Sequence, residues 1–189
     1  MIKFVTGNFN SHIAADATFA KITDLARTQL INKTFTEGKN SITITGLNIF
    51  GSAGKVVFEV DVPGSLKGKL FLMGDMVYNP QKMTVEVQNP EFDVKTKNAL
   101  VSSANWLLNG LIIKKMTPYL NYPVKAELEM MKAEANKTLS NYEVNEGVSL
   151  TGKLTTLDVQ WLDIVPGAVR INANLRGNVG LKVNDLKWQ

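Results

Sequence analysis

The residues that could do acid–base or nucleophilic chemistry are few, and none belongs to a recognisable catalytic pattern. The chain has one histidine, His12, and no cysteine. A mechanism of the Ser-His-Asp kind would need His12 as its base, and no nucleophile-elbow sequence accompanies it. We therefore interpret His12 as a surface or capping residue near the N-terminus.

The acidic side chains also lack the spacing of a catalytic or metal-binding set. Glu127 and Glu129 stand among lysines on one amphipathic stretch, which is the pattern of a solvated helix face. Asp158 and Asp163 lack the spacing of carboxylates in a calcium loop. The glycine-rich turn at residues 51–54 matches neither a phosphate-binding nor a dinucleotide-binding loop. Without cysteine there is no thiolate nucleophile and no Cys-ligated metal. The sequence predicts a protein that is not an enzyme and has no cofactor or metal.

Composition is that of an ordinary globular protein, with 44% hydrophobic and 20% charged residues among 189. The net charge of +4 comes from lysines spread through every segment, and aromatic residues do not interleave with them. This distribution argues against a nucleic-acid interface. The length predicts a single domain, residues 1–189, and leaves open that the chain is the C-terminal half of a longer protein. The N-terminal sequence lacks the basic start and long apolar core of a signal peptide.

The elements that must position any site are predicted from periodicity. Alternation of apolar residues predicts an up-and-down antiparallel meander of four strands, bent at Gly46 and at Asn89-Pro90. These strands cover residues 41–50, 55–62, 66–78 and 83–94. Strands are also expected after residue 147, and the clearest runs from Val169 to Val183. Helical spacing predicts amphipathic helices from about Ser11 to Asn32 and from Val124 to Ser140.

The longest uncharged run, Asn98 to Met116, predicts a helix that is apolar nearly all round. It is too short and too rich in asparagine and serine to span a bilayer. Trp106 and Ile113 fall on the same arc as its polar residues, and a helix of this kind is normally buried. Either other protein atoms cover the Trp106 side, or that side is the floor of an apolar groove.

A groove of this kind would be shared with the strand 66–78, whose second face also carries apolar residues. Methionine side chains adapt to irregular apolar ligands, and several are available near the expected groove. The residues predicted to bind an apolar ligand are Phe71, Met73, Trp106, Leu107, Gly110, Ile113, Met130, Met131 and Trp161.

The middle of the chain carries a series of short motifs. They are Gly64-Ser65 with Gly68, the Tyr78-Asn79 turn, Phe92-Asp93-Val94 with Thr96 and Asn98, and Trp106-Leu107. Together with the closing strand INANLRGNVGLKV, they resemble an uncharacterised family of exported bacterial envelope proteins, a domain of unknown function. The resemblance extends from about Phe19 onward. The sequence departs from the family pattern at Asp75-Met76, where family members commonly have a proline. Members of that family are usually longer, which supports the interpretation of this chain as the C-terminal half of a longer protein.

That family in turn resembles the tubular lipid-binding (TULIP) superfamily, which includes bactericidal/permeability-increasing protein. The resemblance implies an α+β fold, in which a long, strongly curved antiparallel sheet wraps around a long apolar helix. Additional amphipathic helices complete this TULIP-like half, and lipid lies in the seam.

The expected function is non-enzymatic binding of a lipid or other apolar ligand between the curved sheet and the Asn98–Met116 helix. The alternative is a structural or protein-interaction envelope domain with a solid core and no ligand. Expected partners are a lipid or apolar small molecule and the N-terminal half of the same protein. Neither nucleic acid nor a transmembrane span is expected, and the expected location is the periplasm or outer cell envelope.

Overall fold

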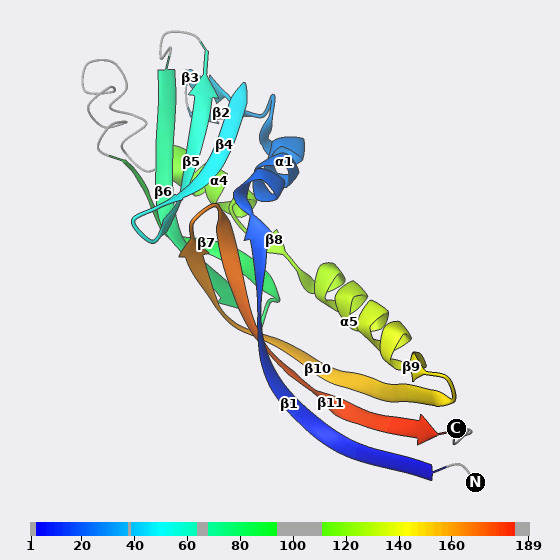
Figure 1. The fold of residues 1–189 in the computed structure, drawn as a ribbon. Coiled ribbons are helices and arrows are strands. Elements are labelled where there is room, and N and C mark those ends of the chain that lie inside the picture. Colours follow the sequence, from blue (N-terminus) through cyan, green and yellow to red (C-terminus); the bar gives the residue numbers. More distant parts are fainter. Residues whose placement is uncertain (1–2, 38, 64–67, 94–110, 184–189) are drawn as a thin grey trace. The chain divides into compact units, whose positions relative to one another are not determined.

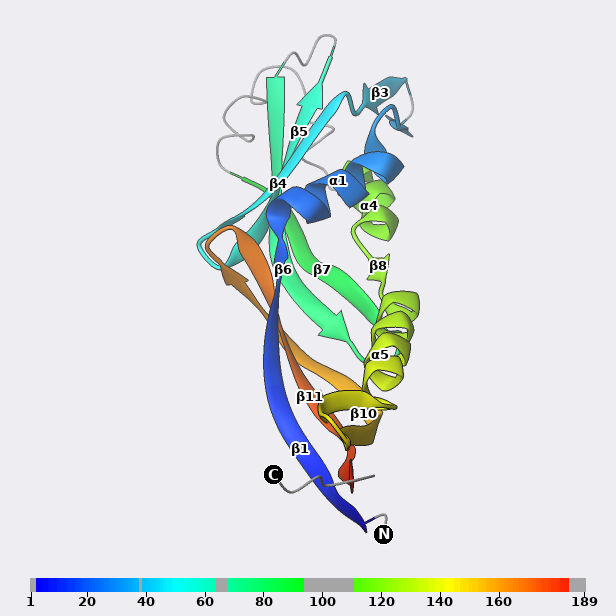
Figure 2. The same ribbon diagram turned by 45° about the vertical axis from the view of Figure 1, so that its right-hand side comes forward.

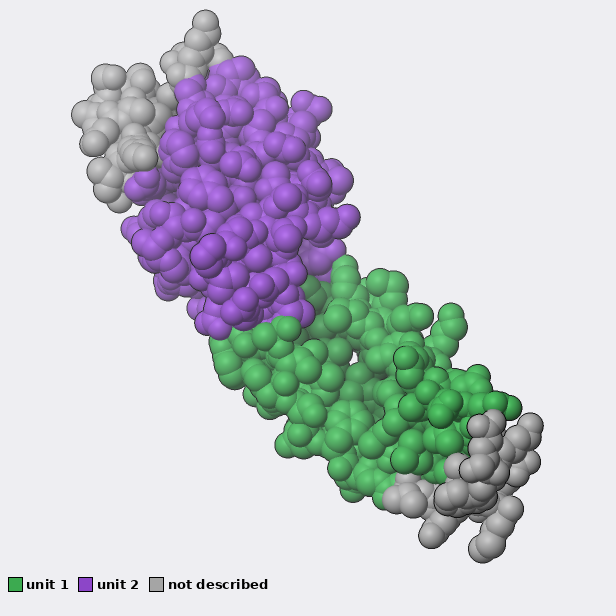
Figure 3. All heavy atoms as spheres, in the orientation of Figure 1, with its two compact units in different colours: residues 1–14, 124–161, 172–189 green, residues 15–123, 162–171 purple. Residues whose placement is uncertain are grey.

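The computed structural model describes residues 3–37, 39–63, 68–93 and 111–183 (Figure 1). Of the described residues, 62% lie in strands and 22% in helices. The chain divides into two compact units (Figure 3). Unit 1 comprises residues 1–14, 124–161 and 172–189, and unit 2 comprises residues 15–123 and 162–171.

The expected α+β fold, with a sheet wrapped around one long apolar helix, is wrong. The structure is mostly β, with two curled half-barrel sheets and short helices. Of the run Asn98–Met116, residues 98–110 lie outside the described residues, and the remainder forms the short helix α4 (Leu111–Met116). Among the described residues of unit 2, several short elements pack on the sheet, so no single long apolar helix is needed to cover it.

Unit 2 contains a five-stranded sheet with the order β4-β5-β6-β7-β8. Strands β4 to β7 follow one another in the chain and pair antiparallel, which confirms the predicted meander. Their bounds are β4 (Gly46–Ser52), β5 (Lys55–Val62), β6 (Gly68–Asn79), β7 (Thr84–Phe92) and β8 (Tyr122–Pro123).

The predicted bend at Asn89-Pro90 is a bulge between β6 and β7. Met73 pairs with Glu91 and Asp75 with Gln88, so two residues of β7 face the single residue Gly74. The predicted bend at Gly46 is instead a break between strands. β3 (Asn40–Thr43) pairs with β2 (Thr34–Glu37) in a separate two-stranded sheet, and β4 begins at Gly46.

The first helix begins later than predicted. Residues up to Thr18 belong to the strand β1 (Lys3–Thr18), and α1 covers Phe19–Leu30. The Thr18 hydroxyl accepts a hydrogen bond from the backbone N–H of Lys21 and caps the helix start. The predicted helix from Ser11 is therefore wrong over its first residues, because pairing with β11 holds that segment extended.

The hydrophobic core of unit 2 is built from short elements on the inner face of its sheet. Helix α1, the β2–β3 pair and α4 pack there, together with Leu120, which follows the 3-10 turn η2 (Thr117–Tyr119). Lys115 of α4 donates a hydrogen bond to the Thr36 carbonyl of β2, and Met116 is 5% exposed.

Unit 1 is formed around the four-stranded sheet with the order β1-β11-β10-β9. Its further elements are α5 (Lys125–Leu139), β9 (Tyr142–Asn145), β10 (Val148–Val165) and β11 (Ala168–Val183). Strands β1, β10 and β11 also contribute residues to unit 2. The positions of α5 and β11 confirm the predicted second amphipathic helix and the predicted closing strand. Figures 1 and 2 show β1 as the outermost strand beside β11.

Candidate functional site

His12, the only histidine, holds strands together in unit 1. Its ring stacks on Trp161 of β10, with centroids 5.3 Å apart and planes inclined by 17°. Nδ1 of His12 lies 3.2 Å from Oδ1 of Asn174 on β11, so the ring donates to an amide oxygen. These contacts position the ring against an aromatic side chain and an amide. In the part of the chain that the structure describes, no three His, Asp or Glu side chains gather into a metal-binding group.

Two carboxylates with lowered pKa values, Asp16 and Glu59, are paired with cations on neighbouring strands. Arg170 donates hydrogen bonds of 2.8 and 2.9 Å to Asp16, and they hold the pKa of Asp16 below its usual range. Lys69 donates to Glu59 and lowers the pKa of that carboxyl in the same way. Each charge is balanced by its neighbour across the sheet, so these pairs secure strand pairing.

The predicted groove residues of unit 2 do not share one surface. Phe71 and Met73 are half-buried on β6, and strand alternation places them on the face opposite Leu70 and Leu72. Ile113 of α4 packs on the core side, where Leu70 and Leu72 also lie. Trp106, Leu107 and Gly110 lie outside the described residues.

A small apolar cavity lies in the core of unit 2. Its volume is about 10 Å³. This is about the space that one water molecule needs, so the cavity is too small for a lipid chain. Its lining residues are Ile42, Ile44, Val60, Leu70, Leu72, Phe92 and Met116.

The apolar side chains of unit 1 are much less covered. Its buried apolar residues in the described chain are Leu154, Val159 and Ala173, whereas unit 2 contains all the others. Many large apolar residues of unit 1 are exposed instead. They are Ile13, Met130, Met131, Tyr142, Val144, Trp161 and Leu181, and Met130 reaches 67% exposure.

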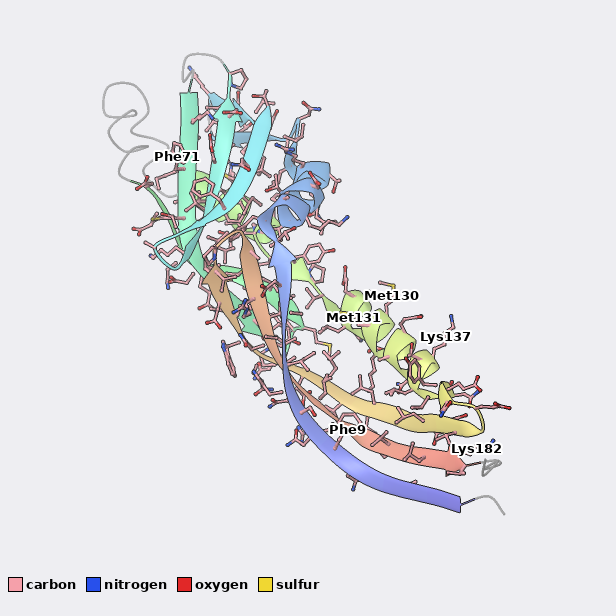
Figure 4. All side chains as sticks on the ribbon, in the orientation of Figure 1. Phe9, Phe71, Met130, Met131, Lys137 and Lys182 are labelled. Carbon is pink, nitrogen blue, oxygen red and sulfur yellow. The ribbon has the colours of Figure 1, made fainter. Side chains whose placement is uncertain are left out.

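Helix α5 lies beside β10 without burying any of its residues. The Asn136 side chain joins the two elements, because its Oδ1 accepts from the Leu154 N–H at 2.6 Å and its Nδ2 donates to the Leu154 carbonyl at 3.2 Å. Met131 points from α5 toward β10, and Met130 points away from it (Figure 4). The atoms of unit 1 leave a small gap between the helix and the sheet (Figure 3).

Three of the predicted site residues, Met130, Met131 and Trp161, are thus among the exposed apolar side chains of unit 1. Sequence reasoning missed other exposed apolar residues of unit 1, including Ile13, which was assigned to a helix. It also missed Asn136, which fixes α5 to β10. The sequence signal that could have revealed this role is the position of the Asn136 amide, which lies next to the apolar stripe of an otherwise regular amphipathic helix.

The described residues define a mostly β protein with one well-packed unit and one unit rich in exposed apolar side chains. None of its described helices has the length and apolar character that crossing a membrane requires. Residues 2–183 match the family described as Domain of unknown function (DUF4403), and the chain belongs to this family. Neither the curated proteins nor the solved structures gave a match.

Proposed function

We propose that this protein is a non-enzymatic binding protein for a lipid or another apolar ligand in the bacterial envelope, and that unit 1 holds the ligand between α5 and its sheet. The observation that carries this proposal is that α5 lies beside β10 with no buried residue. An amphipathic helix normally buries its apolar stripe against its own domain. Here Leu128, Ala135 and Leu139 of that stripe are only half-buried. Met131 is 51% exposed, so part of the stripe remains available to a ligand.

The chemistry of the surface suits an apolar ligand of irregular shape. Met131 is 51% exposed although it points toward the sheet, and Leu181 on β11 is 43% exposed. Water contact at such side chains costs about 25 cal/mol for each Å² of apolar surface, so a ligand that covers them gains free energy. The flexible thioether of methionine can follow different ligand shapes.

The envelope location and the kinship with the tubular lipid-binding superfamily rest on the sequence resemblance. The wrapped long helix is not part of the proposal. The site also differs from the predicted groove, since it uses Met131 and α5 in place of Phe71 and Met73.

The test is lipid extraction of the purified chain, followed by titration with the apolar fluorophore N-phenyl-1-naphthylamine. We expect co-purified lipid and saturable probe binding. Met131→Gln should weaken probe binding about tenfold, because a buried methionine contributes roughly 1.5 kcal/mol. Met130→Gln is the matched control on the outward side of the same helix and should leave the affinity nearly unchanged.

Absence of both lipid and probe binding would count against the proposal. Equal weakening by the two methionine variants would show that the probe meets the outer surface of α5 and not the space between helix and sheet.

A second candidate function is a protein-interaction domain without a ligand. The observation that favours it is the close-packed core of unit 2, whose cavity has a volume of only about 10 Å³. If this function is correct, the exposed side chains of unit 1 are covered by another protein. Native mass spectrometry of the purified chain would then show the bare mass and no lipid adduct.

A further inference from the structure

Several edges of the described sheets carry features that protect them from other strands. An exposed strand edge presents unpaired backbone N–H and C=O groups to other chains, and proteins normally protect it. In unit 2, helix α1 guards the outer edge of β4. The Thr23 hydroxyl accepts from the Ile49 N–H at 3.0 Å and lies 3.4 Å from its carbonyl oxygen, and Arg27 Nε donates to the Leu47 carbonyl at 2.9 Å.

The other edge of that sheet is protected by its sequence. β8 covers only Thr84 and Val85 of β7. Farther along β7, Asn89 has a φ of 49° and is followed by Pro90 in the bulge. A bulge and a proline both interrupt the regular row of hydrogen-bonding groups that an incoming strand needs.

In unit 1, the β9 side of the sheet is guarded over part of its length. β9 has four residues, and beyond it the Asn136 side chain of α5 occupies both backbone groups of Leu154. The amide of Asn136 thus replaces the neighbouring strand that β10 lacks at this point.

The opposite edge of unit 1 has none of these devices. β1 has sixteen residues, and among the described residues no strand pairs with its outer side. Side chains from Thr6 to Ala14 are exposed except Phe9, which is half-buried against Gly177. The sequence from residue 4 to residue 15 contains no proline, lysine, arginine, aspartate or glutamate.

We propose that the outer edge of β1 pairs antiparallel with the same edge of a second copy of this chain, centred between Thr6 and Ala14. Only an extended backbone matches a row of alternating N–H and C=O groups. A second copy suits this edge because antiparallel pairing is self-complementary and closes as a two-fold dimer. The uncharged stretch brings no like charges together across the new strand pair.

The first test uses the absence of cysteine in the chain. Single cysteines are introduced in turn at the exposed positions Thr6, Asn8, Asn10, Ser11, Ile13 and Ala14. A disulfide needs Cα atoms within about 7 Å, so under mild oxidation only positions near the two-fold axis should give a disulfide-linked dimer. Gln81→Cys, in the exposed turn before β7, is the control for random collisions. Lack of a linked dimer at every β1 position, or equal yield at Gln81→Cys, overturns the proposal.

The second test is sedimentation velocity over a range of protein concentrations. The unmodified chain should show a monomer–dimer equilibrium. The double variant Asn8→Lys with Asn10→Lys should raise the dimer Kd about tenfold or more, because like charges then meet across the strand pair. Asn141→Lys with Asn145→Lys adds the same charge at the β9 side of the sheet, away from this edge, and should leave the Kd unchanged. A chain that is monomeric throughout, or a dimer insensitive to the β1 lysines, overturns the proposal.

Discussion

Gly177 on β11 occupies a place where a side chain does not fit. A Cβ atom there would overlap the Lys153 carbonyl oxygen of β10 and would lie 2.8 Å from two ring atoms of Phe9 on β1. The glycine therefore lets three strands of unit 1 approach closely, with the Phe9 ring covering the exposed backbone.

Gly177→Ala should lower the free energy of unfolding by about 1–3 kcal/mol, because the backbone of β10 must shift to accept the methyl group. Urea unfolding followed by far-ultraviolet circular dichroism measures this. Gly7→Ala on β1 is the matched control, since a Cβ there meets no atom within 4 Å. If both variants lose the same stability, the effect comes from strand propensity and not from the overlap.

Glu86 on β7 is one residue whose contribution to stability should depend on pH. A hydrogen bond from the Thr84 hydroxyl, with further ones from Lys82 and Asn79, holds the pKa of its carboxyl below the usual range. A carboxyl with a lowered pKa in the folded state stabilises the fold above its unfolded-state pKa. This stabilisation is lost as the pH falls through the folded-state pKa.

Glu86→Gln should therefore make the free energy of unfolding fall less steeply on the acid side. Chemical unfolding at a series of pH values measures the slope. Thr84→Val removes the shortest of these hydrogen bonds but keeps the carboxyl, so it should produce part of the same change. An unaltered slope in Glu86→Gln would show that the carboxyl titrates alike in the folded and unfolded chain.

Individual residues differ in how far the sequence reveals their roles. The bulge at Asn89-Pro90 could be predicted because a proline interrupts the alternation of its own strand. The role of Gly177 could not, because it depends on which strands lie on either side. The partners of the predicted binding residue Trp161 were equally hidden, since His12 is distant in sequence from β10.

At the scale of elements, local periodicity predicted the strands and helices whose partners are near in sequence. The meander β4 to β7 and the helix α5 are of this kind. β1 was partly mistaken for a helix because apolar residues from Ala15 onward recur at helical spacing. Its strand conformation comes from pairing with β11, and the contact between His12 and Asn174 spans 162 residues. Pairing at that distance overrides a local preference.

The attachment of α5 is a second element that depends on one side chain. Asn136→Ala leaves the backbone N–H and carbonyl of Leu154 without their partners, which costs about 1–3 kcal/mol for a buried group. We expect faster hydrogen exchange at the Leu154 amide and faster proteolysis within α5. Asn141→Ala, just beyond the helix, is the control. Unchanged exchange at Leu154 would mean that α5 is held mainly by its apolar stripe.

At the scale of the whole molecule, the fold class could not be inferred from the uncharged run at residues 98–116. That inference assumed that one curved sheet must be filled by one long helix. The core of unit 2 is filled by α1, α4 and the β2–β3 pair, each too short to indicate its role from composition. The distinction between a covered and an uncovered unit was also hidden, because apolar alternation in β11 continues through both.

The uneven burial of apolar side chains predicts uneven stability. Local opening requires less free energy where few apolar contacts are buried. Amides of β10 and β11 in unit 1, where buried apolar side chains are few, should exchange faster than those of β5 and β6, where Val56 and Leu72 are almost fully buried. Hydrogen exchange measured by mass spectrometry tests this along each strand.

The same measurement connects stability with the proposed function. A ligand that binds only the folded state stabilises it in proportion to its occupancy. Saturating N-phenyl-1-naphthylamine should therefore slow exchange in α5, β10 and β11 of unit 1 and leave β5 and β6 unchanged. In Met131→Gln this protection should be weaker at the same probe concentration. Protection spread evenly over both units, or confined to β5 and β6, would move the apolar site away from α5.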